Sequence, residues 1–332
     1  MDKEELCKTT DEEKKISVII PCHNAELTID RCMESVEKQT IGMENLEIVL
    51  VNDASEDKTL EKLCAWEAKY PNTVMVINCE ENKKPGGARN IGMDYAGGRY
   101  IAFADADDIL EEDMYEMLFE AADKQCDVAI CGSSREIACE RKKIPQKEMI
   151  EITSNQERKK FVEKNYNMAV WNKIYLRDLL LENNIRFIEG VIYEDIYFSE
   201  LVKHYCKKVY VTDEVLYHHI LNDKSISCDT NSKVNRINYI EVHIALIEEL
   251  QRRGLYEPFA EMYANKFIIH FISFMKSYEM VFGKMEKELE DIIFNSVKAL
   301  YPNYKEIPIA KSILYAGQEE NRKMLERLVQ SD

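Results

Sequence analysis

Three carboxylates follow the apolar stretch Tyr100–Ala104 within four positions: Asp105, Asp107 and Asp108. Clustered like charges repel one another and lose solvation when a fold brings them together, so a buried strand rarely ends this way without a compensating charge. A divalent cation supplies that charge, and Mg²⁺ and Mn²⁺ prefer carboxylate oxygens. In open α/β sheets, ligands bind outside the carboxyl ends of the strands. The triplet therefore indicates a metal and phosphate site at a strand end, with a solvated acidic loop before a helix as the alternative.

The stretches around these carboxylates predict alternating strands and helices. Short apolar runs predict buried strands at 16–20, 46–51, 74–77, 100–104 and 127–131. Between them, apolar side chains recur at helical spacing, as at Ile29, Cys32, Met33 and Val36. Strands that alternate with helices at these lengths imply βαβ units and a mainly parallel sheet flanked by helices.

The second half of the chain is less regular at first and then helical. From Ser133 to about Met168 the pattern weakens, and the charged segment 141–147 suggests a surface hairpin or loop. A helix is predicted at 193–205, strands are predicted at 209–211 and 215–217, and helices follow from about Asn231. We expect a polar tail at 1–14, an α/β domain at 15–228 with halves 15–131 and 132–228, and a helical region at 229–332.

The composition is that of a globular protein, with 332 residues, 45% hydrophobic and 32% charged. Its formal net charge of −17 argues against binding a nucleic acid through a broad basic surface. The ten cysteines contain no CxxC pair, and the polar N-terminus has no signal-peptide core, so we expect reduced thiols and a cytoplasmic location. The aromatic stripe Tyr263, Phe267, Phe271 and Phe274 predicts a helix core or a seam between helices, with a membrane-surface or partner face as the alternative.

Several known binding motifs also lie at strand ends, and each requires particular residues that can be sought in the sequence. A dinucleotide-binding turn needs glycines after the first strand, where Pro21–Asn24 has none, and no Walker-type loop occurs. An EF-hand loop counted from Asp105 would need glycine where Leu110 stands. A phosphatase with an aspartyl nucleophile remains an alternative, because Lys173 and the Glu194–Asp195 pair could serve as its downstream lysine and acids.

Four motifs in order resemble the N-terminal part of a family 2 glycosyltransferase of the GT-A fold. They are Ile16–Asn24, Val51–Ser55, Gly87–Gly92 and Ala104–Asp108. Further on, Trp171–Lys173 and Tyr193–Phe198 resemble the acceptor-side motifs of that family. The resemblance covers roughly residues 15 to 228, and several ordered motifs are far more specific than one.

The resemblance implies a nucleoside diphosphate sugar donor, most often a UDP-sugar. Asp53 would accept a hydrogen bond from the uracil N–H, and Arg89 would reach the base or the phosphates. His23, in the turn with Pro21 and Asn24, stands where the family usually has a tyrosine that stacks on the base. An imidazole ring stacks more weakly, so the base preference is less firmly implied.

The resemblance also assigns the carboxylates of the triplet. Asp105 would lie near the ribose with Ala106, and Asp107 would ligate Mn²⁺ or Mg²⁺ on the diphosphate with Asp108 assisting. The cation would neutralise charge that develops on the leaving diphosphate.

On the acceptor side, the resemblance implies that Asp195 is the general base of an inverting transfer. Neighbouring helix residues face apart, so Glu194 is expected to be structural. Trp171 and Lys173 would line the acceptor side, with a core position as the alternative for Trp171.

One departure from the family concerns the segment before Ser225-Ile226-Ser227. Ile220 stands where an arginine is expected, so His218 or His219 would supply the phosphate contact, with ordinary packing as the alternative.

The resulting expectation is an inverting, metal-dependent glycosyltransferase that builds a surface polysaccharide or related glycan. Its acceptor would be a glycan or a lipid-linked molecule, a peripheral contact with the inner membrane face through the C-terminal helices is left open, and so is oligomerisation. The alternative from another class is a non-catalytic sugar-nucleotide-binding or assembly protein with the same fold.

Overall fold

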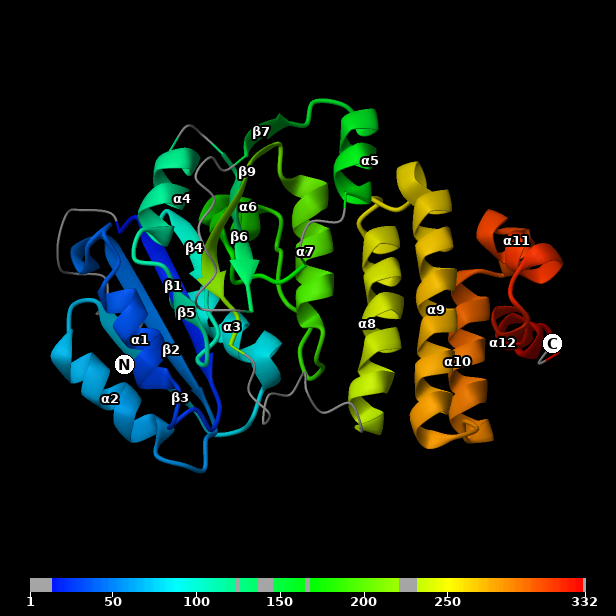
Figure 1. Cartoon of the computed structure of the whole chain (residues 1–332), viewed down its shortest axis with the longest axis horizontal. Coiled ribbons are helices and arrows are strands. Elements are labelled where there is room, and N and C mark those ends of the chain that lie inside the picture. The colour runs from blue at the N-terminus through cyan, green and yellow to red at the C-terminus, as the bar shows by residue number, and fades with distance from the viewer. Residues whose placement is uncertain (1–13, 124–125, 136–145, 165–167, 221–231, 331–332) are drawn as a thin grey trace. The chain divides into compact units, whose positions relative to one another are not determined.

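The computed structural model describes residues 14–123, 126–135, 146–164, 168–220 and 232–330 (Figure 1). The chain divides into two compact units. The described residues of unit 1 fall within Met1–Thr153, Ala169–Gly190 and Tyr205–Asn222, and those of unit 2 within Ser154–Met168, Val191–His204 and Asp223–Asp332.

The described residues of unit 1 form a nine-stranded mixed sheet. Its strands are β1 (Ile16–Cys22), β2 (Leu46–Asp53), β3 (Val74–Cys79), β4 (Tyr100–Phe103), β5 (Ile109–Leu110), β6 (Val128–Ser134), β7 (Lys147–Glu151), β8 (Lys173–Leu176) and β9 (Lys208–His218). The order is β3-β2-β1-β4-β8-β6-β9-β5, with β7 paired to β9. The first four strands are parallel, whereas β8 runs antiparallel to both β4 and β6. The predicted α/β class is confirmed, and the parallel arrangement is found mainly in the N-terminal half.

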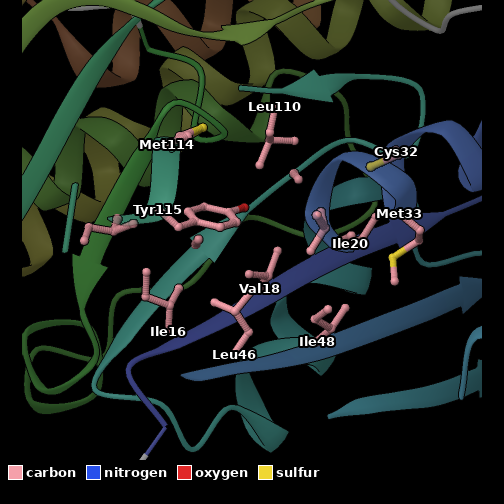
Figure 2. Close-up of a cluster of buried hydrophobic side chains, with 14 of the residues drawn as sticks. Ile16, Val18, Ile20, Cys32, Met33, Leu46, Ile48, Leu110, Met114 and Tyr115 are labelled. Atoms are coloured by element: carbon pink, nitrogen blue, oxygen red, sulfur yellow. The ribbon is translucent and has the colours of Figure 1, made fainter. Parts of the chain in front are cut away.

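Helices cover both faces of this sheet. They are α1 (Ile29–Glu37), α2 (Thr59–Lys69), α3 (Lys84–Tyr95), α4 (Met114–Ala122) and α6 (Arg177–Glu182), and a short 3₁₀ turn η1 (Met43–Asn45) precedes β2. Successive strand residues point to opposite faces. Val18 and Ile20 therefore join the core cluster that includes Met33 of α1, shown in Figure 2. Ile19 points the other way, where α3 approaches so closely that a Cβ at Gly92 would lie 2.3 Å from its Cγ2.

Several strands are longer than the sequence predicted. β1 continues through Pro21, which was predicted to end the strand. A proline is tolerated there because β4 pairs with β1 only as far as Ile19. The missing N–H of Pro21 therefore costs no ladder bond on that side. β2 likewise includes Asn52 and Asp53, and the two strands predicted at 209–217 are one strand with an irregular register opposite Gly132.

The segment predicted to lack regular structure contains two elements. β7 is an edge strand whose side chains are mostly exposed, so it has no apolar alternation to detect. Helix α5 (Asn155–Glu163) opens with a capping box in which Ser154 and Glu157 satisfy each other's backbone N–H groups. The charged residues 141–145 of the same prediction lie outside the described residues.

The described residues of unit 2 form helices joined by short connections. It contains α5, α7 (Glu194–Tyr205), α8 (Lys233–Arg252), α9 (Ala260–Phe282), α10 (Lys287–Leu300), α11 (Pro308–Ala316) and α12 (Glu319–Gln330), with 3₁₀ turns η3 (Glu257–Phe259) and η4 (Tyr304–Glu306). The predicted helical C-terminal region is confirmed. Helices α5 and α7 pack with the C-terminal helices in unit 2, although their residues were expected to belong to the acceptor half of the α/β domain. The domain boundary at residue 228 stays a prediction.

The aromatic stripe on α9 lies in the core of unit 2. Tyr263, Phe267, Phe271 and Phe274 are each at most 3% exposed. The core interpretation of this stripe is therefore correct, and these rings are not available to a membrane surface. Within the described parts of the chain, each helix is too short or too polar to cross a bilayer.

Candidate active site

The loops after β1, β2 and β4 meet at one edge of the sheet because these strands are parallel. Asn24 joins the first two loops: its backbone N–H donates to Ser55 Oγ at 3.0 Å and its Oδ1 accepts from Glu56 N at 2.9 Å. It adopts a left-handed backbone with φ of 50°, which asparagine tolerates better than most residues. Asn24 thus holds the two loops together, and its contact with a nucleotide stays a prediction.

His23 and Asp53 lie next to each other at this edge. Nδ1 of His23 is 2.7 Å from the carbonyl oxygen of Asp53, and since a carbonyl only accepts, Nδ1 donates. The imidazole ring is exposed, whereas Asp53 is 3% exposed and its Oδ1 accepts from Lys83 N at 2.6 Å. Burial raises the pKa of the Asp53 carboxyl. The arrangement presents a fixed, solvent-facing ring beside a buried carboxylate.

Arg89 and Asp105 form a shielded ion pair. Nη2 of Arg89 lies 2.7 Å from Oδ1 of Asp105, and the guanidinium is 5.4 Å from the centre of the Phe187 ring. Arg89 is 5% exposed, so its charge is held inside the fold. The first carboxylate of the triplet is therefore compensated by the protein.

Asp108 is hydrogen-bonded by residues at and just after the end of β9. Its side chain is fully buried, Oδ2 accepts from the Tyr217 hydroxyl at 2.7 Å, and Oδ1 accepts from Ile220 N at 2.8 Å. Nδ1 of His219 lies 3.2 Å from Oδ1, and this contact raises the pKa of His219. These partners favour a role in holding the loop, and the predicted assistance to a metal stays a prediction.

Asp107 differs from its two neighbours. Among the described residues, no other side chain forms a hydrogen bond or ion pair with its carboxylate, which receives a hydrogen bond from the backbone N–H of Asp107 itself. Its carbonyl oxygen accepts from Arg31 Nη2 at 2.5 Å. Burial, together with the charges of Asp105 and Asp108, raises the pKa of Asp107 to about 6. A partly buried carboxylate with two neighbouring negative charges and no ion pair among the described residues fits a divalent metal ion.

A metal bound to Asp107 would need ligands beyond the described residues. The described residues contain no cluster of three or more His, Cys, Asp or Glu side chains arranged to hold an ion. Mg²⁺ and similar cations are commonly bound by one or two carboxylates together with substrate phosphates and water. The site therefore suits a cation that arrives with a phosphate-bearing substrate.

The predicted acceptor-side residues of unit 1 differ in accessibility. Trp171 is partly buried and stacks on Tyr217, with ring centroids 4.3 Å apart and planes at 14°; its ring is also parallel to that of His219. Lys173 is 4% exposed, and its ammonium donates to the Asn172 side chain at 2.7 Å. Lys173 therefore supports its own segment, and Trp171 belongs to a packed stack of rings.

The two candidate histidines, His218 and His219, differ in their surroundings. His218 is 1% exposed and its Nε2 lies 2.6 Å from Glu111 Oε1, so its environment matches the alternative of ordinary packing. His219 is half-buried beside Asp108 and near the carboxylate triplet. Of the two, the geometry favours His219 for a phosphate contact. Ala106 is buried within the same loop.

Glu194 and Asp195 open helix α7 of unit 2. Glu194 is 6% exposed, in agreement with a structural role, whereas Asp195 is more accessible. Oδ1 of Asp195 accepts from Ile196 N at 2.9 Å, as an acid in the first helical turn can. The proposed action of Asp195 as a base stays a prediction.

Sequence reasoning missed two residues that contact the triplet. Tyr217 bonds to both Asp105 and Asp108, and Arg31 bonds to Asp107. Both come from segments assigned only to a strand and to a helix, and nothing local in the sequence marks either as a partner of residues more than 70 positions away.

The family model "Glycosyl transferase family 2" matches residues 17–182. The uncharacterised glycosyltransferase YibD of Escherichia coli (strain K12) is 31% identical over 77% of this chain and 74% of its own length. The minor teichoic acid biosynthesis protein GgaB of Bacillus subtilis (strain 168) is 42% identical over 32% of this chain and 12% of its own length.

Among solved structures, the fold is similar to TarS of S. aureus, residues 1–349 in complex with UDP-GlcNAc. The TM-score is 0.72 at 22% identity, covering 96% of this chain and 91% of that one. The chain belongs to glycosyltransferase family 2 and has the GT-A fold, as its motifs predicted. It is therefore a glycosyltransferase, and this assignment decides against the phosphatase alternative.

Proposed function

We propose that this glycosyltransferase uses a UDP-sugar together with a divalent cation and transfers the sugar with inversion to a hydroxyl of a surface glycan. The observation that carries the proposal is the Asp107 carboxylate: it lies in a cluster of three acids, and no side chain among the described residues forms an ion pair or hydrogen bond with it. Asp105 and Asp108 have protein partners, so Asp107 is the member of the triplet left to bind a ligand.

The donor end of the site is built from His23, Asp53 and Arg89. The fixed, exposed ring of His23 stacks on the base, and Asp53 accepts from the uracil N–H. Arg89 holds Asp105 in place for the ribose, and its expected contact with the base or the phosphates stays a prediction. A UDP-sugar is further supported by the similar fold of TarS, which was solved with UDP-GlcNAc.

Asp107 would hold the cation, either Mn²⁺ or Mg²⁺. When bound, the ion supplies neutralisation of the charge that develops on the diphosphate leaving group. The protein's part is to keep the Asp107 loop in one shape, which the contacts of Asp105 and Asp108 achieve.

Asp195 would act as the general base. As the acceptor oxygen attacks the anomeric carbon, its proton passes to the Asp195 carboxylate and the bond to the diphosphate breaks. Attack from the face opposite the leaving group inverts the configuration. Of the two acids on the first turn of α7, Asp195 is the more accessible, which supports this role.

The proposed class of acceptor is supported by a relative of the chain, GgaB. GgaB is named for teichoic acid biosynthesis, which supports a surface polymer or its lipid-linked precursor as the acceptor. This chain spans 12% of GgaB, so the likeness concerns one segment of that protein.

The test is UDP release from a panel of UDP-sugars with glycan acceptors, in Mn²⁺ and in chelator. We expect Mn²⁺-dependent release with at least one sugar, and a loss of about 10²-fold or more in Asp195→Asn, as for removal of a general base. The matched control is Asp178→Asn, an exposed acid on α6, which should retain full activity. Binding of UDP without turnover of any donor would instead favour the non-catalytic alternative.

A further inference from the structure

Tyr217 connects both ends of the loop that carries Asp107. Its hydroxyl donates to Asp108 Oδ2 at 2.7 Å, and the backbone N–H of Asp105 donates to the same hydroxyl oxygen at 3.1 Å. The two partners flank Asp107 in the sequence, whereas Tyr217 comes from the end of β9, more than 100 positions later.

The hydroxyl has a defined place because the ring cannot move. Tyr217 is fully buried and lies on β9, where it pairs with Leu110 of β5 and Ser133 of β6. Trp171 stacks on its ring with centroids 4.3 Å apart and an angle of 14° between the planes. A side chain packed on this many sides keeps one rotamer.

The hydrogen bonds also fix the direction of the Asp108 side chain. Tyr217 has one proton to donate, and a carboxylate is the acceptor that it meets, so the orientation of the hydroxyl is determined. The other carboxylate oxygen of Asp108 accepts from Ile220 N at 2.8 Å. Both oxygens are therefore bound to the end of β9, and the turn closed by the Asp108 N to Asp105 carbonyl bond is anchored at each end.

We propose that Tyr217 is a positioning residue for the metal site: its hydroxyl holds the Asp105–Asp108 turn in the shape in which Asp107 would bind a cation. The proposal rests on the proposed function, since it assumes that Asp107 binds a metal together with a nucleotide diphosphate. Tyr217 itself contacts neither. Partners of this kind typically change metal affinity by about 10- to 100-fold when they are removed.

The test compares two tyrosine hydroxyls in the same unit. Tyr217→Phe keeps the ring and its stack on Trp171 and removes the hydroxyl alone. Tyr100→Phe is the matched control, because Tyr100 is also fully buried and its hydroxyl donates to Ala122 O at 2.9 Å, away from the triplet. Both variants lose one buried hydroxyl, so a general loss of stability affects both.

Two measurements are made on the whole chain: calorimetric titration of UDP in Mn²⁺ and in chelator, and amide hydrogen exchange without ligand. In Mn²⁺ we expect the Kd for UDP to rise about tenfold in Tyr217→Phe and less than about twofold in Tyr100→Phe. In chelator the three proteins should bind UDP equally. The amides of 105–108 should exchange faster in Tyr217→Phe alone, because the Asp105 N–H loses its acceptor.

Two failures can be distinguished. If the unchanged protein shows no Mn²⁺-dependent UDP binding, the proposed function falls and this inference falls with it. If the unchanged protein binds UDP in this way and Tyr217→Phe binds it equally well, or exchanges its 105–108 amides at the unchanged rate, the positioning role alone is overturned.

Discussion

Nη2 of Arg89 lies 2.7 Å from Oδ1 of Asp105, and the arginine side chain is 6% exposed while the aspartate side chain is 28% exposed. A guanidinium on α3 thus neutralises the first acid of the triplet. Asp108 is hydrogen-bonded by Tyr217 and by the backbone of Ile220, although burial raises the pKa of its carboxyl. Of the three acids, Asp107 is the one whose carboxylate has no side-chain partner among the described residues. The difference between three adjacent acids lies in their partners.

Removing one member of this ion pair should be costly. Arg89→Ala leaves the Asp105 carboxylate without its cation in a partly buried place, and we expect a loss of roughly 3 kcal/mol in the free energy of unfolding. The matched control is Arg99→Ala, which breaks the exposed pair with Asp123 and should cost less than about 1 kcal/mol. Urea unfolding of the three proteins measures both, and equal losses would contradict the assigned burial of the Arg89 pair.

The packing of α3 on the sheet gives a second prediction. A Cβ at Gly92 would lie 2.3 Å from Ile19 Cγ2, so Gly92→Ala must displace the helix or the strand. We expect a loss of roughly 1–3 kcal/mol. At Gly97 a Cβ would meet only the Glu47 carboxylate, at 3.6 Å, so Gly97→Ala is the control with a small effect. A neutral Gly92→Ala in thermal unfolding would show that α3 does not approach β1 this closely.

The pH dependence of unit 2 gives a third prediction, centred on His204. The ring is 7% exposed and its Nε2 lies 2.6 Å from the Tyr263 hydroxyl. Burial lowers the pKa of His204 to about 4, and three nearby cations act in the same direction against one acid. The charged groups that face it are Glu200 and Lys203 of α7, Arg158 of α5 and Lys266 of α9.

The sign follows from proton uptake. The unfolded chain binds a proton at this residue near pH 6.5, and the folded chain only near pH 4, so stability is lost as the pH falls between these values. At about pH 5 the loss relative to neutral pH should be roughly 2 kcal/mol. Urea unfolding of the unchanged protein and of His204→Gln at both pH values checks this. An identical pH dependence in the variant would rule out His204 as the source.

Part of this site could be predicted from sequence because its residues follow predicted strands. Asp53 and Asp107 come after apolar runs, and parallel strands bring their carboxyl ends to one edge. The partners of these acids could not be predicted in the same way. Tyr217 looks like an ordinary strand residue, and its bond to Asp108 depends on how β9 pairs with β5 and β6, which local patterns do not specify.

Two further residues or elements have environments that their sequence does not reveal. The resemblance places Lys173 on the acceptor side, a role that stays a prediction, and the structure shows that this lysine is buried and bonds to its own segment. Strand β7 was missed because an exposed edge strand carries no apolar pattern. In both cases the position within the sheet, and not the residue type, determines the environment.

The central claim is that Asp107 binds a divalent cation together with a UDP-sugar. The most direct measurement is calorimetric titration of UDP into the protein in Mn²⁺ and in chelator, repeated with Asp107→Asn and with Asp123→Asn as an exposed control. We expect Mn²⁺-dependent binding that weakens about 100-fold, or roughly 3 kcal/mol, in Asp107→Asn and is unchanged in the control. Equal UDP binding by Asp107→Asn and the unchanged protein, or no binding with metal, would contradict the account.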